Sequence, residues 1–262
     1  MTKKNKRINS LLDLLKEKST LKLTDIEKHF NISESTARRL CVELEQNGNV
    51  IRTFGGIKYL PENHVVNGHS YSFNLLTNQH ADEKRRIANY ALSQIEHGDT
   101  IFLSSGTTIY QLAAQLAEKI KTNQLMNVTI MTNSIANAEV LSPCVKVVLT
   151  GGEYRCERKD TIGLIGEKAI SGAKFSKVFM GLDAIDISDG LMTWDIDTAR
   201  IDYLAINNSS KVFLLIDSSK FINKSFINYE KLSPEYTIIT DTALESNILD
   251  AAKSSGQSII LV

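Results

Sequence analysis

Cysteine, proline and tryptophan are scarce in this sequence, and long apolar runs are missing. The 262 residues include three cysteines, three prolines and one tryptophan. The cysteines, at positions 41, 144 and 156, have no metal-ligand spacing and no paired framework, so we expect neither a disulfide nor a metal site. Near the N-terminus, Asp13, Lys16 and Glu17 interrupt the apolar residues before a signal-peptide core or a membrane span could form. We therefore expect a cytoplasmic protein, and no motif predicts a cofactor.

Net charge is also missing, but the charges are unevenly distributed. Thirty Lys and Arg balance thirty Asp and Glu over the whole chain. Residues 1–60 hold twelve basic and seven acidic residues, so this segment has a net charge of about +5 and the remainder carries the compensating acid. Such polarity suits a protein that places one end on a polyanion. With 42% hydrophobic residues, the chain is long enough for one small and one medium domain.

The segment 24–56 has the pattern of two helices, a tight turn and a short hairpin. Thr24 and Glu27 have the spacing of a capping box, which predicts that a first helix opens there. Ser33 is expected to cap the second helix, whose apolar residues fall at i, i+3, i+4 and i+7 and predict a buried stripe: Ala37, Leu40, Cys41 and Leu44. An upstream helix with Ile8, Leu11, Leu12 and Leu15 supplies the third helix that so short a core needs. We predict a winged helix-turn-helix over 1–60.

The polar face of the second helix and the hairpin after it are the predicted DNA-binding surface. Two β-prone runs, 50–52 and 57–59, flank a glycine pair, as the wing of such a domain requires. Side chains on the helix would enter the major groove, while basic residues of the wing reach phosphates. The candidate DNA-binding residues are Ser33, Ser35, Thr36, Arg38, Arg39, Val42, Arg52 and Lys58. The alternative is a helical protein-interaction module whose arginines are a solvated face.

The rest of the chain predicts an α/β domain over 74–262, joined by a linker over 61–73. Helical runs such as 84–96 and 109–118 alternate with short apolar or β-branched runs, which indicates a mostly parallel sheet wrapped by helices. Seven strands are predicted, at 100–103, 128–131, 145–149, 177–180, 211–216, 236–239 and 258–261. The carboxyl ends of parallel strands meet at one edge, where small polar groups follow nearly every predicted strand.

These polar groups predict a binding site for a small phosphorylated polyol. Gly106 would let the backbone approach closely, and the helix that opens at Thr107 offers free amides to a phosphate. Lys220 supplies a point charge, Arg155 a planar donor and Asp183 an acceptor for sugar hydroxyls. The candidate effector-binding residues are Ser104, Ser105, Gly106, Thr107, Thr108, Asn133, Gly151, Gly152, Arg155, Asp183 and Lys220.

Both halves resemble the DeoR-type bacterial transcriptional regulators. The resemblance rests on the Ser-x-x-Thr-x-Arg-Arg helix, the Gly-Gly wing, and the segments SSGTT (104–108), LTGGEYR (149–155), DGLMTWD (189–195) and DSSK (217–220). It implies an effector sheet similar to that of ribose-5-phosphate isomerase, and an oligomeric repressor that responds to a sugar phosphate. Ser104 stands where the family usually has Asp, Thr198 where it has Glu, and Asp202 where a basic residue is common. These departures indicate either a different effector or a weaker response.

Three functions are compatible with these patterns. The leading hypothesis is a repressor of an operon for sugar uptake or catabolism that binds operator DNA as a dimer or tetramer and is released by a phosphorylated sugar. The second is a sugar-phosphate isomerase or hydrolase with a DNA-binding arm. None of the five histidines, at 29, 64, 69, 80 and 97, follows a predicted strand, so no Ser/His/Asp triad is expected and we predict no catalytic residues. The third is a constitutive DNA-binding regulator with an inactive pocket.

Overall fold

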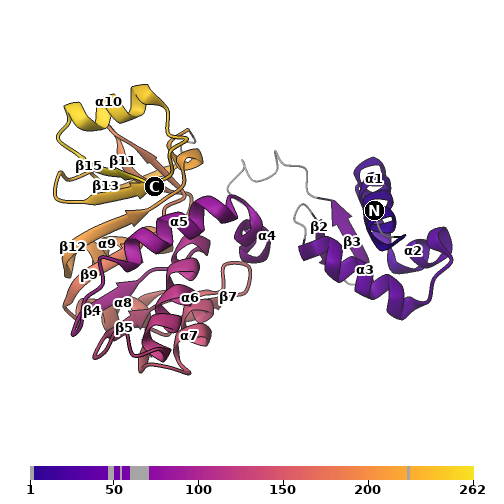
Figure 1. Cartoon of the computed structure of the whole chain (residues 1–262), viewed down its shortest axis with the longest axis horizontal. Helices are drawn as coiled ribbons and strands as arrows, with labels where there is room; N and C mark the ends of the chain where they lie inside the picture. The colour runs from indigo at the N-terminus through magenta and orange to yellow at the C-terminus, as the bar shows by residue number, and fades with distance from the viewer. Residues whose placement is uncertain (1–2, 47–49, 54, 60–70, 223–224) are drawn as a thin grey trace. The chain divides into compact units, whose positions relative to one another are not determined.

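The computed structural model contains two compact units, Met1–Gln79 and His80–Val262 (Figure 1). It describes all residues except 1–2, 47–49, 54, 60–70 and 223–224, and in the helices and strands it leaves the side chains of residues 3–6, 43, 45–46 and 51–53 undescribed. Most of the predicted linker therefore lies outside the described residues. A short helix that was not predicted, α4 (Phe73–Asn78), begins at the last residue of the predicted linker. No helix in the described part of the chain is long and apolar enough to cross a bilayer.

The first unit is the predicted winged helix-turn-helix. Its elements are α1 (Lys3–Lys18), β1 (Thr20–Lys22), α2 (Leu23–Phe30), α3 (Glu34–Gln46), β2 (Val50–Thr53) and β3 (Gly56–Tyr59). The strands form an antiparallel sheet in the order β1-β3-β2. All four residues of the predicted stripe on α3 are buried in one core with Ile8, Leu11 and Leu15 of α1. The winged architecture is confirmed.

The predicted capping box at the start of α2 is wrong. Helix α2 begins at Leu23, with Lys22 at its N-cap and no side-chain cap, so Thr24 lies inside the first turn. The cause is β1, which the sequence did not predict: Lys22 pairs with Gly56, and the Leu23 amide donates to the Gly55 carbonyl at 2.8 Å. This strand pairing places the N-cap at Lys22, two residues before the Thr24 that the capping pattern predicts. A Cβ on Gly56 would lie 2.2 Å from the Leu21 carbonyl oxygen, so this crossing requires glycine.

The second unit is built on a seven-stranded parallel sheet. Its strands, in spatial order, are β15 (Ser258–Leu261), β14 (Thr237–Thr240), β12 (Ser209–Leu215), β9 (Phe175–Met180), β4 (Thr100–Leu103), β5 (Thr129–Thr132) and β6 (Val147–Leu149). All six neighbouring pairs are parallel. The seven predicted strands are these seven, with bounds that differ by up to two residues at either end.

Helices and two small antiparallel sheets complete this unit. The helices are α5 (Ala81–Leu92), α6 (Thr107–Lys121), α7 (Ile135–Leu141), α8 (Leu164–Ser171), α9 (Ile196–Asn207), α10 (Ser246–Ser254) and the 3-10 turn η2 (Ser218–Phe221). One small sheet pairs β7 (Glu153–Arg155) with β8 (Asp160–Ile162); the other has the order β10 (Ala184–Asp186), β11 (Gly190–Thr193), β13 (Ile227–Glu230). None of these five short strands was predicted. The mostly parallel α/β class is confirmed.

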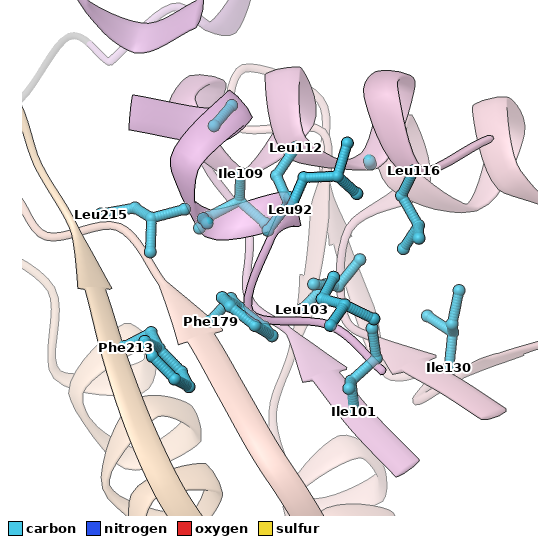
Figure 2. Packing of buried hydrophobic residues seen from close by; sticks show 14 of the residues in the cluster. Leu92, Ile101, Leu103, Ile109, Leu112, Leu116, Ile130, Phe179, Phe213 and Leu215 are labelled. Carbon is cyan, nitrogen blue, oxygen red and sulfur yellow. The ribbon is translucent and has the colours of Figure 1, made fainter. Parts of the chain in front are cut away.

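The central strands of the sheet are buried on both faces. On one face, Leu92 of α5 and Leu112 of α6 pack towards Leu103 and Phe179, and the Phe179 and Phe213 rings stack with centroids 4.9 Å apart (Figure 2). On the other face, the alternate strand residues Phe102, Val178, Met180 and Leu214 pack with Ile170 of α8 and Ile201 and Ala205 of α9. Side chains alternate between faces along a strand, so a sheet buried on both sides needs continuous apolar runs. This three-layer core holds the carboxyl ends of the strands in fixed positions.

Candidate functional site

The exposed face of α3 carries the predicted DNA-reading side chains. Ser33 immediately precedes α3, and its carbonyl accepts a hydrogen bond from the Ala37 amide at 2.9 Å. Its hydroxyl lies 3.1 Å from that of Ser35 and 3.0 Å from that of Thr36, so three hydroxyls gather at the start of the helix. Hydroxyls and free amides at a helix N-terminus can donate to DNA phosphates.

Positive charge follows one turn further along this face. Arg38 is ion-paired with Glu34 at 2.6 Å, but both side chains are mostly exposed, at 68% and 58%. Such a surface pair contributes little to stability, so a phosphate can replace the glutamate at small cost. Arg39 and, on β3, Lys58 are exposed, and Val42 is half-buried. The side chain of Arg52 lies outside the described residues.

The predicted effector residues are brought to one edge of the large sheet. Their loops follow the neighbouring strands β12, β9, β4, β5 and β6, and all of these strands are parallel. Helix α5 precedes β4, so its first turn also lies at this edge, as expected for a helix that runs antiparallel to the strands it covers. Loops from five strands and the start of one helix therefore lie at the same edge of the sheet, where ligands of open α/β sheets bind.

The loop between β4 and α6 has the geometry of an anion site. Gly106 is the N-cap of the 15-residue α6, with φ +114°, and it has no side chain to satisfy the first amides of the helix. A Cβ added there would meet no atom within 4 Å, so this side of the backbone is open. Free N–H groups and the helix dipole together favour an anion at such a position. Ser104, by contrast, is 2% exposed and accepts from the Gly181 amide at 3.3 Å, so it joins two loops of the edge.

Two lysines contribute positive charge at the same edge, and sequence reasoning missed one of them. Lys84 of α5 is buried, and this burial lowers the pKa of its ammonium to about 8 against the opposing attraction of Asp217. Lys220, predicted from the sequence, is close enough to lower that pKa further. The missed signal was present: Lys84 lies at helical spacing with the buried Ile87, Ala88 and Ala91, so a lysine occupies the apolar face of the helix.

Arg155 has four hydrogen bonds to neighbouring side chains. Its Nε and Nη2 donate to the two carboxylate oxygens of Asp160, each at 2.8 Å. Nη1 donates to Asp195 at 2.6 Å, and Nη2 also donates to the Thr198 hydroxyl at 3.0 Å. Burial raises the pKa of Asp195, but the Thr198 amide and Arg155 outweigh burial and hold that pKa below its usual value. Sequence reasoning missed Asp160 because its pairing partner Ser134 is distant in sequence.

Asn133, Gly151 and Gly152, also predicted to bind the effector, contact the β7–β8 hairpin. The Asn133 carbonyl accepts from the Thr161 amide at 2.8 Å, and its side-chain amide donates to the Thr161 carbonyl at 3.3 Å. A Cβ on Gly152 would lie 2.1 Å from the Ile162 carbonyl oxygen, and Gly151 has φ +74°. These three residues hold the hairpin at the carboxyl edge, and a role in contacting an effector stays a prediction.

Asp183 lies beside a second, deeper carboxyl. Its two oxygens accept from the Thr193 hydroxyl at 2.7 Å and from Arg158 at 3.4 Å. Burial, together with the nearby Asp183, raises the pKa of Asp202 to about 8, and the Tyr229 hydroxyl lies 3.3 Å from it. Among the residues that the structure describes, no group of three or more His, Cys, Asp and Glu side chains is arranged to hold a metal ion.

Comparison with known proteins identifies both units. Residues 7–63 match the DeoR-like helix-turn-helix domain, and residues 79–242 match the DeoR C-terminal sensor domain. The chain belongs to the DeoR family. The predictions of this family and of a transcriptional regulator with a DNA-binding and a sensor domain are therefore confirmed.

The similarity to curated relatives extends over nearly the whole chain. The lactose phosphotransferase system repressor of Lactococcus lactis subsp. lactis is 33% identical over 249 residues, which cover 94% of each chain. The HTH-type transcriptional regulator GlpR of Haloferax volcanii is 28% identical over 255 residues, which cover 97% of this chain and 96% of GlpR. Among solved structures, ribose 5-phosphate isomerase A of Methanocaldococcus jannaschii is similar over 55% of each chain, with 16% identity and a TM-score of 0.42.

Proposed function

We propose that this DeoR-family regulator represses an operon for sugar uptake or catabolism, and that a phosphorylated sugar bound at the carboxyl edge of the parallel sheet releases it from DNA. The names of the relatives support the carbohydrate assignment, since several are lactose phosphotransferase system repressors. We further propose that it acts in the cytoplasm, where the operator is, and binds the effector without turnover.

The open glycine at the start of α6 is the observation that carries this proposal. Gly106 leaves one side of the backbone unoccupied next to the first amides of α6, where a phosphate would accept hydrogen bonds. Lys84 and Lys220 bring two ammonium groups to the same edge, and a doubly charged phosphate would offset their mutual repulsion. The carboxylates of Asp183 and Asp217 would accept hydrogen bonds from sugar hydroxyls.

The DNA-binding side of the proposal requires more than one copy of the chain. A single recognition helix reads only a few base pairs, and specific affinity normally comes from two half-sites about 34 Å apart. We therefore propose a homo-oligomer, a dimer or a tetramer, in which α3 of each protomer enters a major groove. Ser35 and Arg39 would face base edges, whereas Ser33 and Lys58 would contact phosphates.

An operator titration tests the proposal. A duplex selected from a random pool by the full-length protein is titrated by fluorescence anisotropy, with and without a panel of phosphorylated sugars and their unphosphorylated counterparts. We expect one or more phosphorylated sugars to weaken binding at least tenfold and the unphosphorylated sugars to have no effect. Lys84→Met, which removes an ammonium of the site, should bind the operator normally and lose the response; Lys253→Met, on α10, is the matched control.

Two outcomes contradict the proposal in different ways. If no phosphorylated sugar changes operator binding and none binds the protein, the chain is a constitutive regulator. If the sugar phosphate is converted to another compound in the same reaction, the chain is an enzyme, and the lowered pKa of Lys84 would then suit a general base.

A further inference from the structure

A fully buried carboxylate lies against the predicted phosphate loop. Asp160 of β8 is 0% exposed, and its Oδ2 accepts a hydrogen bond from the Ser105 hydroxyl at 3.0 Å. Ser105 directly precedes Gly106, so Asp160 holds the loop at the residue before the open glycine. A buried negative charge beside an anion site lowers anion affinity unless another group cancels it.

Arg155 neutralises the Asp160 carboxylate through a bidentate pair. Two of its nitrogens donate to the two oxygens of Asp160 at 2.8 Å, the bidentate arrangement that gives the strongest arginine–carboxylate pairs. Ser105, Asp160 and Arg155 therefore form a chain of contacts that runs away from the loop. Arg158 also approaches Asp160, but only to 3.8 Å, and it donates a hydrogen bond to Asp183.

The same arginine is fixed from its other side. Its Nη1 donates to Asp195 at 2.6 Å, and Asp195 is itself held as the N-cap of α9 by the Thr198 amide at 2.7 Å. The Arg155 side chain is only 15% exposed and is held at both ends, so its guanidinium cannot turn towards a ligand without giving up both hydrogen bonds to Asp160. Among the described residues, the buried carboxylate would then keep only the more distant Arg158, at 3.8 Å, as a cationic neighbour. Leaving a buried charge without its partner is strongly unfavourable. The structure thus argues against the direct phosphate contact that the sequence predicted for Arg155.

We propose that Arg155 is a positioning residue that acts on the effector phosphate through Asp160: Asp160 fixes Ser105 and hence the loop, and Arg155 neutralises Asp160. This inference rests on the proposed function, because it concerns the same phosphate site. Phosphate affinity should therefore depend on Arg155 only while residue 160 carries a negative charge.

The test is a double-mutant cycle on the full-length chain. Binding of inorganic phosphate is measured by phosphorus NMR at constant ionic strength. Arg155→Met should weaken phosphate binding about tenfold or more, because it leaves the Asp160 charge beside the loop. Asp160→Asn, which keeps an acceptor for Ser105, should bind phosphate at least as tightly as wild type. The double variant should return to within about threefold of wild type.

A direct contact between Arg155 and phosphate would give a different result. If Arg155 contacted the phosphate directly, the double variant would bind as weakly as Arg155→Met, and Asp160→Asn would not rescue it. Arg155→Lys, which keeps the charge but not the bidentate geometry, should lie between wild type and Arg155→Met. Arg200→Met removes an exposed arginine of α9, 59% exposed, and is the matched control expected to leave phosphate affinity unchanged.

Two further measurements distinguish a variant that does not fold from one that folds but does not bind phosphate. Circular dichroism and thermal melting report whether each variant folds. If Arg155→Met does not fold, Asp160→Asn decides alone, since phosphate binding more than threefold weaker than wild type overturns the inference. A wild-type protein that binds no phosphate contradicts the proposed site together with this inference, whereas a binding wild type with an unrescued double variant overturns the inference alone.

Discussion

Gly106 and Gly152 were both predicted to bind the effector, yet the structure gives them opposite surroundings. A methyl group added to Gly106 would point into open space, whereas one added to Gly152 would lie 2.1 Å from the Ile162 carbonyl oxygen. The same substitution, glycine to alanine, therefore separates a glycine that faces open space from one that faces the protein. We predict that Gly106→Ala loses phosphate binding with a modest loss of stability, and that Gly152→Ala is mainly destabilised.

The magnitudes follow from the backbone and from the overlap. Gly106 has φ +114° and ψ 158°, a region that is essentially restricted to glycine, so alanine there costs about 1–3 kcal/mol. For a unit of the size of His80–Val262, about 2 kcal/mol lowers the melting temperature by about 4–8 °C. Gly152 has φ +117° and must in addition relieve a backbone overlap, so Gly152→Ala should cost about 3–6 kcal/mol.

The assay is thermal melting of wild type and both variants with increasing inorganic phosphate. At about one hundred times its dissociation constant, phosphate adds about 2.7 kcal/mol to the stability of a protein that binds it. Wild type should show this rise, Gly106→Ala should not, and Gly152→Ala should show it from a much lower starting temperature. A Gly106→Ala protein with the full phosphate-dependent rise would refute the assignment of the loop as the phosphate site.

Three further substitutions test the DNA surface and the buried carboxyl. Arg39→Ala should weaken the selected operator by about 1–3 kcal/mol in anisotropy titrations, and unchanged affinity would contradict the assigned face. Lys58→Ala should weaken all duplexes alike and reduce the salt slope by about 0.9, whereas a changed sequence preference would make the wing a base reader. Because burial raises the pKa of Asp202 to about 8, its contribution to stability is present at low pH and is lost as pH rises towards 8. Asp202→Asn should therefore raise the melting temperature by several degrees at pH 8 and little at pH 5; an equal change at both would show that the carboxyl is not protonated by burial.

The strands of the large sheet could be predicted because the pattern that marks each of them lies within the strand itself. A strand covered by helices on both faces needs apolar side chains on both, as in Phe102 and Leu103 of β4, which belong to the two different core clusters. The resulting runs can be recognised without knowing what pairs with them. Their order, and hence which loops become neighbours, follows from long-range pairings.

The unpredicted elements depend on partners far away in sequence. Strand β1 has one buried residue, Leu21, and exists because β3 pairs with it. That pairing also overrode the capping pattern at Thr24, which is a local signal of about 1 kcal/mol. Strand β8 and its Asp160 are positioned by residues after β5, so the site's buried carboxylate could not be found from local spacing.

A sugar phosphate at the sheet edge can release DNA only if it binds the DNA-free protein more tightly than the DNA-bound protein. If a phosphorylated sugar weakens operator binding tenfold, linkage requires that the operator weaken sugar-phosphate binding by the same factor, a coupling of about 1.4 kcal/mol. This reciprocity gives a check that needs no knowledge of how the two units move. Sugar-phosphate affinity is measured with the protein free and then saturated with operator, and the ratio is compared with the ratio of operator affinities. Gly106→Ala should abolish sugar-phosphate binding, so neither ligand should change the affinity for the other. Arg39→Ala should lower operator affinity and leave sugar-phosphate binding to the free protein unchanged. If Arg39→Ala weakened that binding in the absence of DNA, the recognition face and the phosphate site would not be separate sites, and the assignment of the two functions to two units would be wrong.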